Sequence, residues 1–104
     1  MEPTANDELG RAKRAEEKFR VSVNFSTVVE QGDAVASSAV TAKRMDTWAD
    51  ATVDVIESPV NNGNVVIATF KGGVDGRDYL FRFRATTTAG DVFVHTLKTM
   101  VRGA

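Results

Sequence analysis

Residues 78–86 alternate between large apolar side chains and polar or small ones, and this alternation restricts the fold more than any other part of the sequence. One set of alternate positions is Tyr79, Phe81, Phe83 and Ala85, and the other is Leu80, Arg82, Arg84 and Thr86. A period of two is typical of a strand with one buried face and one face in water. Glycine-containing turns flank the segment at residues 72–76 and 89–90. The segment therefore predicts a half-buried strand with Arg82 and Arg84 on its outer face.

Five other segments carry strand signals. The predicted strands cover residues 19–26, 34–43, 51–58, 65–70, 78–86 and 91–101. Pro59 is expected to end the third strand, because proline cannot donate a hydrogen bond to a β-ladder. The sequence Asn62-Gly63 favours a tight hairpin before the fourth strand. Six short strands at spacings of about ten residues, without a long amphipathic helix, predict an all-β antiparallel sandwich or barrel.

The residues around Tyr79 favour one kind of sandwich. An aspartate and a glycine lie shortly before this tyrosine, which opens the fifth strand. The arrangement resembles immunoglobulin-type sandwiches, in which a tyrosine anchors the last crossing between the sheets. We therefore expect an immunoglobulin-like antiparallel β-sandwich of six to seven strands.

The alternation also predicts the core. The apolar side chains expected to be buried are Phe19, Val21, Val23, Phe25, Val53, Tyr79, Phe81, Phe83 and Val94. Small residues leave the buried face of residues 34–43 ambiguous, and Val40 and Ala42 are the preferred inward positions. In residues 51–58, Val55 or Ile56 is expected to face inward as well.

Residues 1–17 differ from the rest of the chain in being rich in charge and alanine, and their large apolar side chains are Met1 and Leu9. A helix starting near Asn6 or Asp7 would have no apolar stripe with which to dock, and isolated short helices are marginal in water. We therefore expect residues 1–17 to be a flexible tail and residues 18–102 to form one folded domain.

Composition narrows the function classes. A chain of 104 residues is the usual size of one domain. The net charge of −1 provides no global field for nucleic acid or anionic lipid. Without cysteine the chain forms no disulfide and no thiolate metal site. It has no apolar run of the ~20 residues that span a membrane. Its N-terminal charges are followed by no apolar segment, so we expect no secretion signal. We expect a cytoplasmic protein that binds no nucleic acid and no membrane.

Several residues could carry chemistry, but each has a simpler explanation. The glycines of residues 72–76 precede a strand, whereas a phosphate loop needs a following helix. The aspartates Asp33, Asp54, Asp75, Asp78 and Asp91 lack the spacing of a calcium loop. His95 has no nucleophile motif of the Gly-x-Ser-x-Gly type to act with. Asn24 opens a formal glycosylation sequon inside a predicted strand, which we interpret as coincidence. We expect no catalytic residue, no metal and no cofactor.

Two features suggest contact with another protein. Arg82 and Arg84 share the outer face of the fifth strand and, with Arg77 and Lys98 nearby, could hold an acidic partner or a nucleic acid backbone. The flanking loops add Asp75 and Asp91 to this candidate interface. The alternative is a solvated face on which these arginines pair with Asp or Glu across the strands. Trp48 is a second open case, since a lone tryptophan is either a core residue or an exposed anchor for a partner.

The order of motifs resembles a family of small proteins encoded among the virion genes of tailed bacteriophages and prophages, often labelled phage fibre–tail adaptors. The resemblance covers about residues 18–102. Its motifs are the strand Phe19-Arg20-Val21-Ser22-Val23-Asn24-Phe25-Ser26, then Gly32-Asp33-Ala34-Val35-Ala36-Ser37-Ser38, then Gly72-Gly73-Val74-Asp75-Gly76-Arg77-Asp78-Tyr79, and then Thr87-Thr88-Ala89-Gly90-Asp91.

This resemblance implies an immunoglobulin-like sandwich that works as a non-enzymatic part of the virion tail, fibre or head–tail junction. It implies other virion proteins as partners, allows homo-oligomerisation in the assembly, and places the protein in the host cytoplasm and then in the virion. The competing hypothesis is a carbohydrate-binding or adhesion module, which would need an exposed aromatic platform. An enzyme is the least favoured class, because the chain has one histidine and no cysteine.

Overall fold

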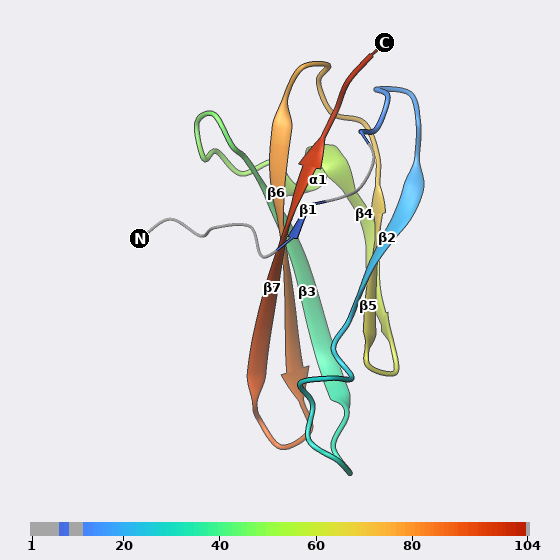
Figure 1. The fold of residues 1–104 in the computed structure, drawn as a ribbon, viewed down its shortest axis with the longest axis vertical. Helices are drawn as coiled ribbons and strands as arrows, with labels where there is room; N and C mark the ends of the chain where they lie inside the picture. The colour runs from blue at the N-terminus through green and yellow to red at the C-terminus, as the bar shows by residue number, and fades with distance from the viewer. Residues whose placement is uncertain (1–6, 9–11, 104) are drawn as a thin grey trace.

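Two sheets face each other along the long axis of the molecule in the computed structural model, which describes residues 7–8 and 12–103 (Figure 1). The first sheet has the strand order β1-β7-β6-β3 and the second has the order β2-β5-β4. The strands are β1 (Asp7–Glu8), β2 (Phe19–Asn24), β3 (Val35–Arg44), β4 (Ile56–Asn62), β5 (Val65–Phe70), β6 (Asp78–Thr87) and β7 (Val92–Met100). Every pairing is antiparallel except that of β1 with β7. The prediction of an all-β protein is confirmed.

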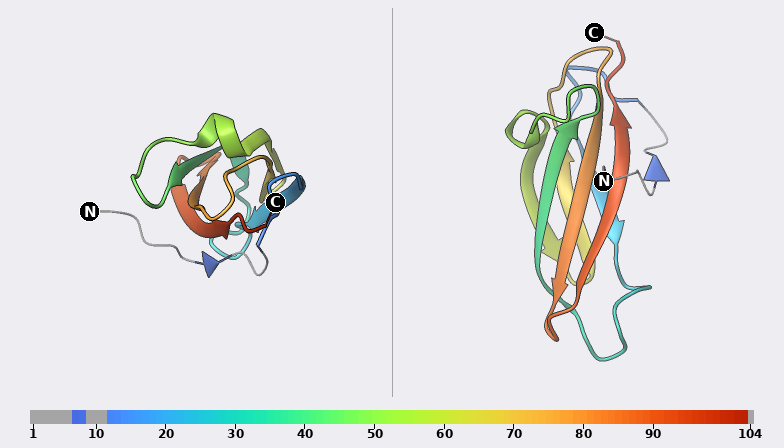
Figure 2. Two further views of the ribbon diagram at one scale, coloured as in Figure 1. Left: turned by 90° about the horizontal axis from the view of Figure 1, so that it is seen from above. Right: turned by 90° about the vertical axis from the view of Figure 1, so that its left-hand side faces the viewer.

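The first sheet contributes more buried side chains to the core than the second. Figure 2 shows β3, β6 and β7 side by side in one layer, with β6 in the middle. The buried side of β6 carries Tyr79, Phe81 and Phe83, each at most 2% exposed. Phe70 from the second sheet lies edge-on to Phe81, with ring centroids 5.0 Å apart. Val21 and Phe25 are also buried as predicted, as are Val40 and Ala42.

Four members of the predicted core are less buried than expected. Phe19 and Val23 are half-buried at the side of the core. Val94 is 40% exposed, so its prediction was wrong. It pairs with Arg84 of β6, which faces solvent, whereas the neighbouring Phe93 packs against the core. In a run of consecutive apolar residues, the pairing register decides which of two alternating faces is buried.

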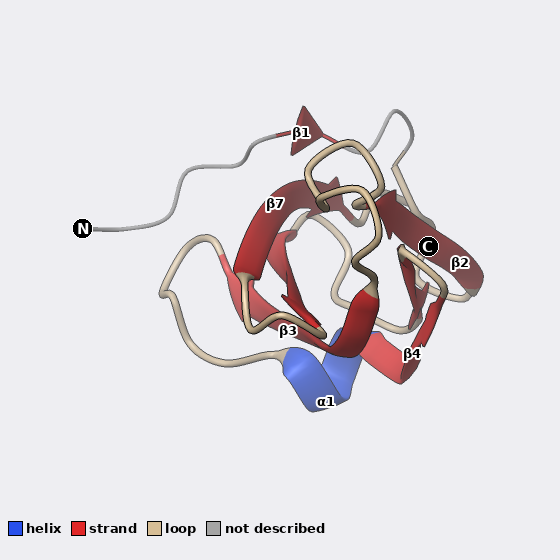
Figure 3. Ribbon diagram, turned by 90° about the horizontal axis from the view of Figure 1, so that it is seen from below, coloured by secondary structure: helices blue, strands red, loops and turns tan. Residues whose placement is uncertain are grey.

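The third predicted strand is only partly a strand, and Val53 is 80% exposed. Residues 52–55 form the helical turn α1 (Thr52–Val55), which lies beside β3 and β4 (Figure 3). Asp50 favours this turn because its carboxylate accepts hydrogen bonds from the backbone N–H and the hydroxyl of Thr52. The turn buries Val55, and Ile56 follows it into the core at the start of β4.

Pro59 does not end a strand, contrary to prediction. It lies inside β4, where the pairing with β5 is irregular between Glu57 and Val60 and where Ser58 has a φ of 51°. β4 is an edge strand, so the N–H that proline lacks is not needed there. The predicted hairpin is confirmed: Asn62 pairs with Val65 across a two-residue loop, and Gly63 has a φ of 60°.

Part of the expected tail, residues 12–17, contacts the folded domain. Lys13 is fully buried, and its backbone exchanges hydrogen bonds with Met100 and Arg102 at the end of β7. The Lys13 ammonium donates to the carbonyl oxygens of Arg14 (2.8 Å), Ala15 (3.1 Å) and Gly72 (2.7 Å). The folded part therefore includes Lys13 and does not begin at residue 18. Residues 1–6 and 9–11 lie outside the described residues.

Tyr79 fixes the loop that precedes β6. The tyrosine is 2% exposed, and its hydroxyl accepts a hydrogen bond from the backbone N–H of Val74 at 3.1 Å. We expect Tyr79→Phe to lower the free energy of unfolding by about 0.5–1.5 kcal/mol, because the Val74 N–H loses its acceptor while the packing of the ring is kept. Hydrogen exchange at the Val74 amide should become faster. Unchanged exchange at this amide would show that the hydroxyl does not hold the loop.

Candidate protein interface

The outer face of β6 presents Arg82 and Arg84 to solvent. In the register of the sheet, Arg82 lies between Thr41 of β3 and Thr96 of β7, and Arg84 lies between Ala39 and Val94. Strand alternation places both guanidinium groups on one side, opposite the buried aromatic face of the same strand.

Among residues 12–103, no acidic side chain pairs with Arg82 or Arg84. The salt bridges instead join Lys18 to Glu57, Arg44 to Asp46, and both Lys98 and Arg102 to Asp78. No cross-strand neighbour of the two arginines is acidic. The structure therefore argues against a solvated face of cross-strand ion pairs, and it leaves two arginines whose charge the described part of the protein does not neutralise.

Apolar and small side chains surround these arginines. Val92 is 46% exposed and Val94 is 40% exposed on the adjacent strand β7. On the other side, β3 exposes Ser37, Ala39 and Thr41. We call these seven residues (Arg82, Arg84, Val92, Val94, Ser37, Ala39 and Thr41) the arginine face. A surface with arginine, exposed apolar groups and little other charge has the composition of protein interfaces.

The other predicted interface residues do not all join the arginine face. Asp91 lies in the turn between β6 and β7, where its backbone N–H and carbonyl both bond to Thr87. Asp75 and Arg77 lie before the opposite end of β6, whose ten residues span roughly 30 Å. The Asp75 carboxylate accepts the backbone N–H of Gly103 at 2.7 Å, so it helps to hold the C-terminal segment. The five predicted residues therefore form no single site.

Sequence reasoning assigned Asp33 to turn capping and solubility but did not identify the turns that it joins. Its carboxylate accepts hydrogen bonds from the backbone N–H groups of Ala34 (2.8 Å) and Ala89 (3.3 Å). The bond from Ala34, followed by one from the Thr87 hydroxyl, lowers the pKa of Asp33 below its usual value. Asp33 thus ties the loop before β3 to the turn between β6 and β7, which fixes the end of the sheet next to Asp91.

The residues that could carry other functions are dispersed. Among the residues that the structure describes, no three His, Cys, Asp or Glu side chains gather as metal ligands. No helix in the same part of the chain is long and apolar enough to cross a membrane. The aromatic side chains form no exposed platform, since Phe19, Trp48 and Phe93 are half-buried and the others are buried. This distribution does not favour a carbohydrate-binding surface.

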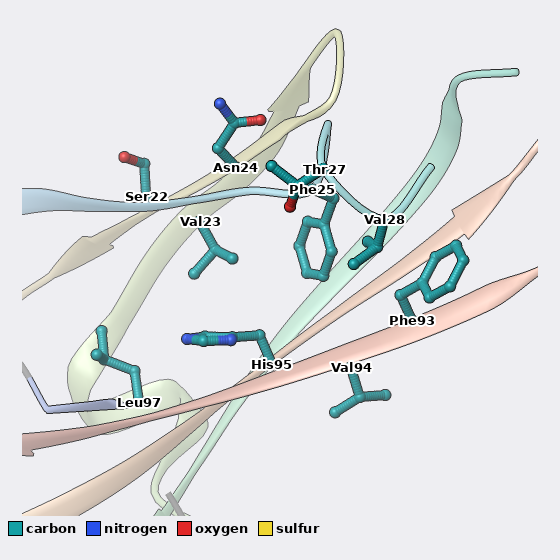
Figure 4. Close-up of a pocket in the computed structure, with 10 residues that line it drawn as sticks. All are labelled: Ser22, Val23, Asn24, Phe25, Thr27, Val28, Phe93, Val94, His95 and Leu97. Atoms are coloured by element: carbon teal, nitrogen blue, oxygen red, sulfur yellow. The ribbon is translucent and has the colours of Figure 1, made fainter. Parts of the chain in front are cut away.

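A groove between β2 and β7 is the second surface feature. It has a volume of about 430 Å³ and is lined by residues 22–25, 27 and 28 from one side and by 93–95 and 97 from the other (Figure 4). His95 lies in it and makes no hydrogen bond or ion pair with the described residues. The groove was not predicted, because it is formed by strands that lie far apart in the sequence.

Comparison with known proteins identifies the family. Curated proteins give no match to this sequence. The sequence matches the Gp77 family, described as podophage GP4 fiber-tail adaptor protein gp77, over residues 13–99. The match begins at the buried Lys13. It includes β2 to β6 in full and all of β7 but its last residue, Met100. The chain therefore belongs to the Gp77 family of podophage fiber-tail adaptor proteins.

Proposed function

We propose that this chain is a non-enzymatic structural module of a phage virion and that it binds other virion proteins through the arginine face. Family membership supports a structural part at the junction of fibre and tail. The observation that carries the choice of surface is the lack of any acidic partner for Arg82 and Arg84 among residues 12–103. An acidic surface on a neighbouring virion protein would supply the missing countercharge, and Val92 and Val94 would add apolar contact.

We further infer that the sandwich is of the immunoglobulin-like type. Two facing sheets with β6 in the middle of one of them are consistent with that architecture. The hydrogen bond to the Tyr79 hydroxyl supports it, because a tyrosine near a strand start that bonds to upstream backbone marks many such domains. We also propose that the protein is made in the host cytoplasm, enters the virion during assembly, and contacts copies of itself there.

Charge reversal tests the arginine face. We expect Arg82→Glu/Arg84→Glu to weaken association with phage tail structures at least about tenfold, because two cations are replaced by anions opposite an acidic partner surface. The fold should persist, with a change in the free energy of unfolding within about 1 kcal/mol, since both side chains are exposed. The measurement is incorporation of the purified variant into particles that lack the wild-type protein.

Arg14→Glu/Arg20→Glu is the matched control. It changes the net charge by the same amount at two exposed positions away from the arginine face, and it should be incorporated normally. Normal incorporation of the Arg82 and Arg84 variant would exclude this face as the interface. Equal loss in both variants would indicate that net charge alone controls assembly.

A further inference from the structure

The two sheets are closed along one side and open along the other. On the closed side, the edge strands β3 and β4 contact each other, and α1 lies beside both. On the open side, the groove separates the edge strand β2 from the part of β7 that β1 does not cover. Figure 4 shows Val23 and Phe25 on one side of this groove, with His95 and Leu97 facing them from β7.

On the side next to the groove, β7 already pairs with another short strand. β1 pairs with it in parallel at Leu97 and Lys98. From Val92 to His95, β7 pairs only with β6 among the described residues. β2 likewise pairs only with β5 in that part of the chain. The backbone of residues 92–95, which among the described residues pairs on one side only, therefore continues directly from a stretch that accepts a strand. Such edges are templates for a further strand.

The lining of the groove defines what it can bind. It contains no Asp, Glu, Lys or Arg, and its apolar side chains come from both strands and from the loop after β2. Phe25 is buried at its base, while Val28 is 49% exposed at its rim. A charged side chain placed here would lose water without gaining a countercharge. The geometry fits an extended segment without charge whose alternate side chains are apolar.

We propose that residues 92–95 of β7 and the adjacent groove bind an extended, uncharged segment of another virion protein by strand addition. The segment pairs its backbone with the free edge of β7 and places alternate apolar side chains against Val23, Phe25 and Phe93. Strand addition obtains affinity from main-chain hydrogen bonds and specificity from the pockets for alternate side chains. The inference rests on the proposed function only in naming the partner as a virion protein. Arg82, Arg84 and the β3 residues of the arginine face remain available for a second partner.

Nuclear magnetic resonance of the isotope-labelled full chain tests this proposal with a defined probe, the blocked peptide acetyl-Thr-Val-Thr-Val-Thr-Val-amide. We expect it to shift amide signals of β2 and β7 and to slow hydrogen exchange at amides within residues 92–95. One control peptide carries methyl groups on alternate backbone nitrogens and cannot complete the strand pairing. A second control has lysine at each valine position. Neither control should bind.

Two variants of the protein assign the site. His95→Lys and Val94→Lys should each weaken the peptide at least about tenfold, since a charge at an open edge opposes strand addition. Val53→Lys adds the same charge at a side chain that is 80% exposed on α1, and it should bind as the wild type does. Circular dichroism checks that each variant is folded. If His95→Lys does not fold, Val94→Lys provides the test.

Other outcomes overturn the proposal. Absence of peptide binding, equal binding of the methylated peptide, or shifts confined to β3 and β6 would show that this edge does not add a strand. Shifts of the same amides on raising the protein concentration alone would make the occupant a second copy of this chain. Binding only after deletion of residues 1–6 would make it the chain's own N-terminus. If the peptide does not bind but Arg82→Glu/Arg84→Glu still blocks incorporation, the proposed function stands and only the strand-addition proposal is refuted. If the peptide binds and that variant is incorporated normally, only the arginine face is refuted.

Discussion

Truncation of Phe81 to alanine should lower the free energy of unfolding by about 3–5 kcal/mol, because it removes a fully buried ring and leaves a cavity. Phe81 lies at the centre of the aromatic cluster, 5.0 Å from Phe70 and 6.4 Å from Phe83 between ring centroids. Its cross-strand neighbours are Ala42 and Leu97, both buried. Typical domains have a free energy of unfolding of about 5–15 kcal/mol, so this loss is roughly a third of the total.

The measurement is the midpoint of urea unfolding followed by circular dichroism. Val53→Ala is the matched control, since Val53 is 80% exposed and its truncation should change the free energy of unfolding by less than about 0.5 kcal/mol. A midpoint for Phe81→Ala within error of the wild type would contradict the packing of the two sheets described above.

Replacement of Lys13 by methionine should destabilise the protein by about 2–4 kcal/mol, although methionine has a similar length and no charge to bury. The carbonyl oxygens of Arg14, Ala15 and Gly72 would lose the ammonium donor that they share. The ammonium also lies 5.3 Å from the ring centroid of Phe70, and this cation–π contact would be lost. Urea unfolding measures the loss, and hydrogen exchange at the Ala15 amide shows whether residues 12–17 detach.

Lys18→Met is the control for the loss of a lysine charge. Lys18 pairs with Glu57 at the surface, so its replacement should cost less than about 1 kcal/mol. Equal stability of Lys13→Met and the wild type would mean that the buried ammonium contributes nothing to the docking of residues 12–17.

Lys13 should also make stability depend on pH in the alkaline range. Burial lowers the pKa of the Lys13 ammonium below its ordinary value of 10.5, and the charge of Glu17 opposes this only in part. Between the lowered pKa of the folded protein and 10.5, the unfolded chain binds more protons at this site than the folded one. The contribution of Lys13 to stability therefore increases as pH rises through that window. Subtracting the pH profile of Lys13→Met from that of the wild type isolates this contribution, and a difference that falls with rising pH would have the wrong sign.

Sequence reasoning was most accurate where the pattern is local. The strict alternation of residues 78–86 assigned Tyr79, Phe81 and Phe83 to the core, because successive side chains of a strand point to opposite faces whatever the strand pairs with. The hairpin at Asn62-Gly63 was predictable for a similar reason, since the positive φ of Gly63 is a property of a few adjacent residues.

The incorrect predictions concern residues whose environment is set by distant parts of the chain. Val94 lies in a run of apolar residues, and only its pairing with Arg84 shows which way it faces. Lys13 has the composition of a solvated tail, yet it is buried because the carbonyl of Gly72, 59 residues further along, completes its set of acceptors. The start of a predicted strand forms α1 instead, where the Asp50 carboxylate accepts a hydrogen bond from the Thr52 backbone N–H. Strand periodicity does not take such side-chain bonds into account.

For the candidate surfaces, the sequence by itself determined that Arg82 and Arg84 share the outer face of one strand and that the chain resembles phage virion proteins. Only the tertiary structure decided that no acidic side chain among the described residues reaches these arginines, and that β2 and β7 leave a groove open between them. The physical reason is that strand periodicity is a property of neighbouring residues, whereas charge neutralisation and the closing of a sandwich depend on which distant strands come to lie side by side.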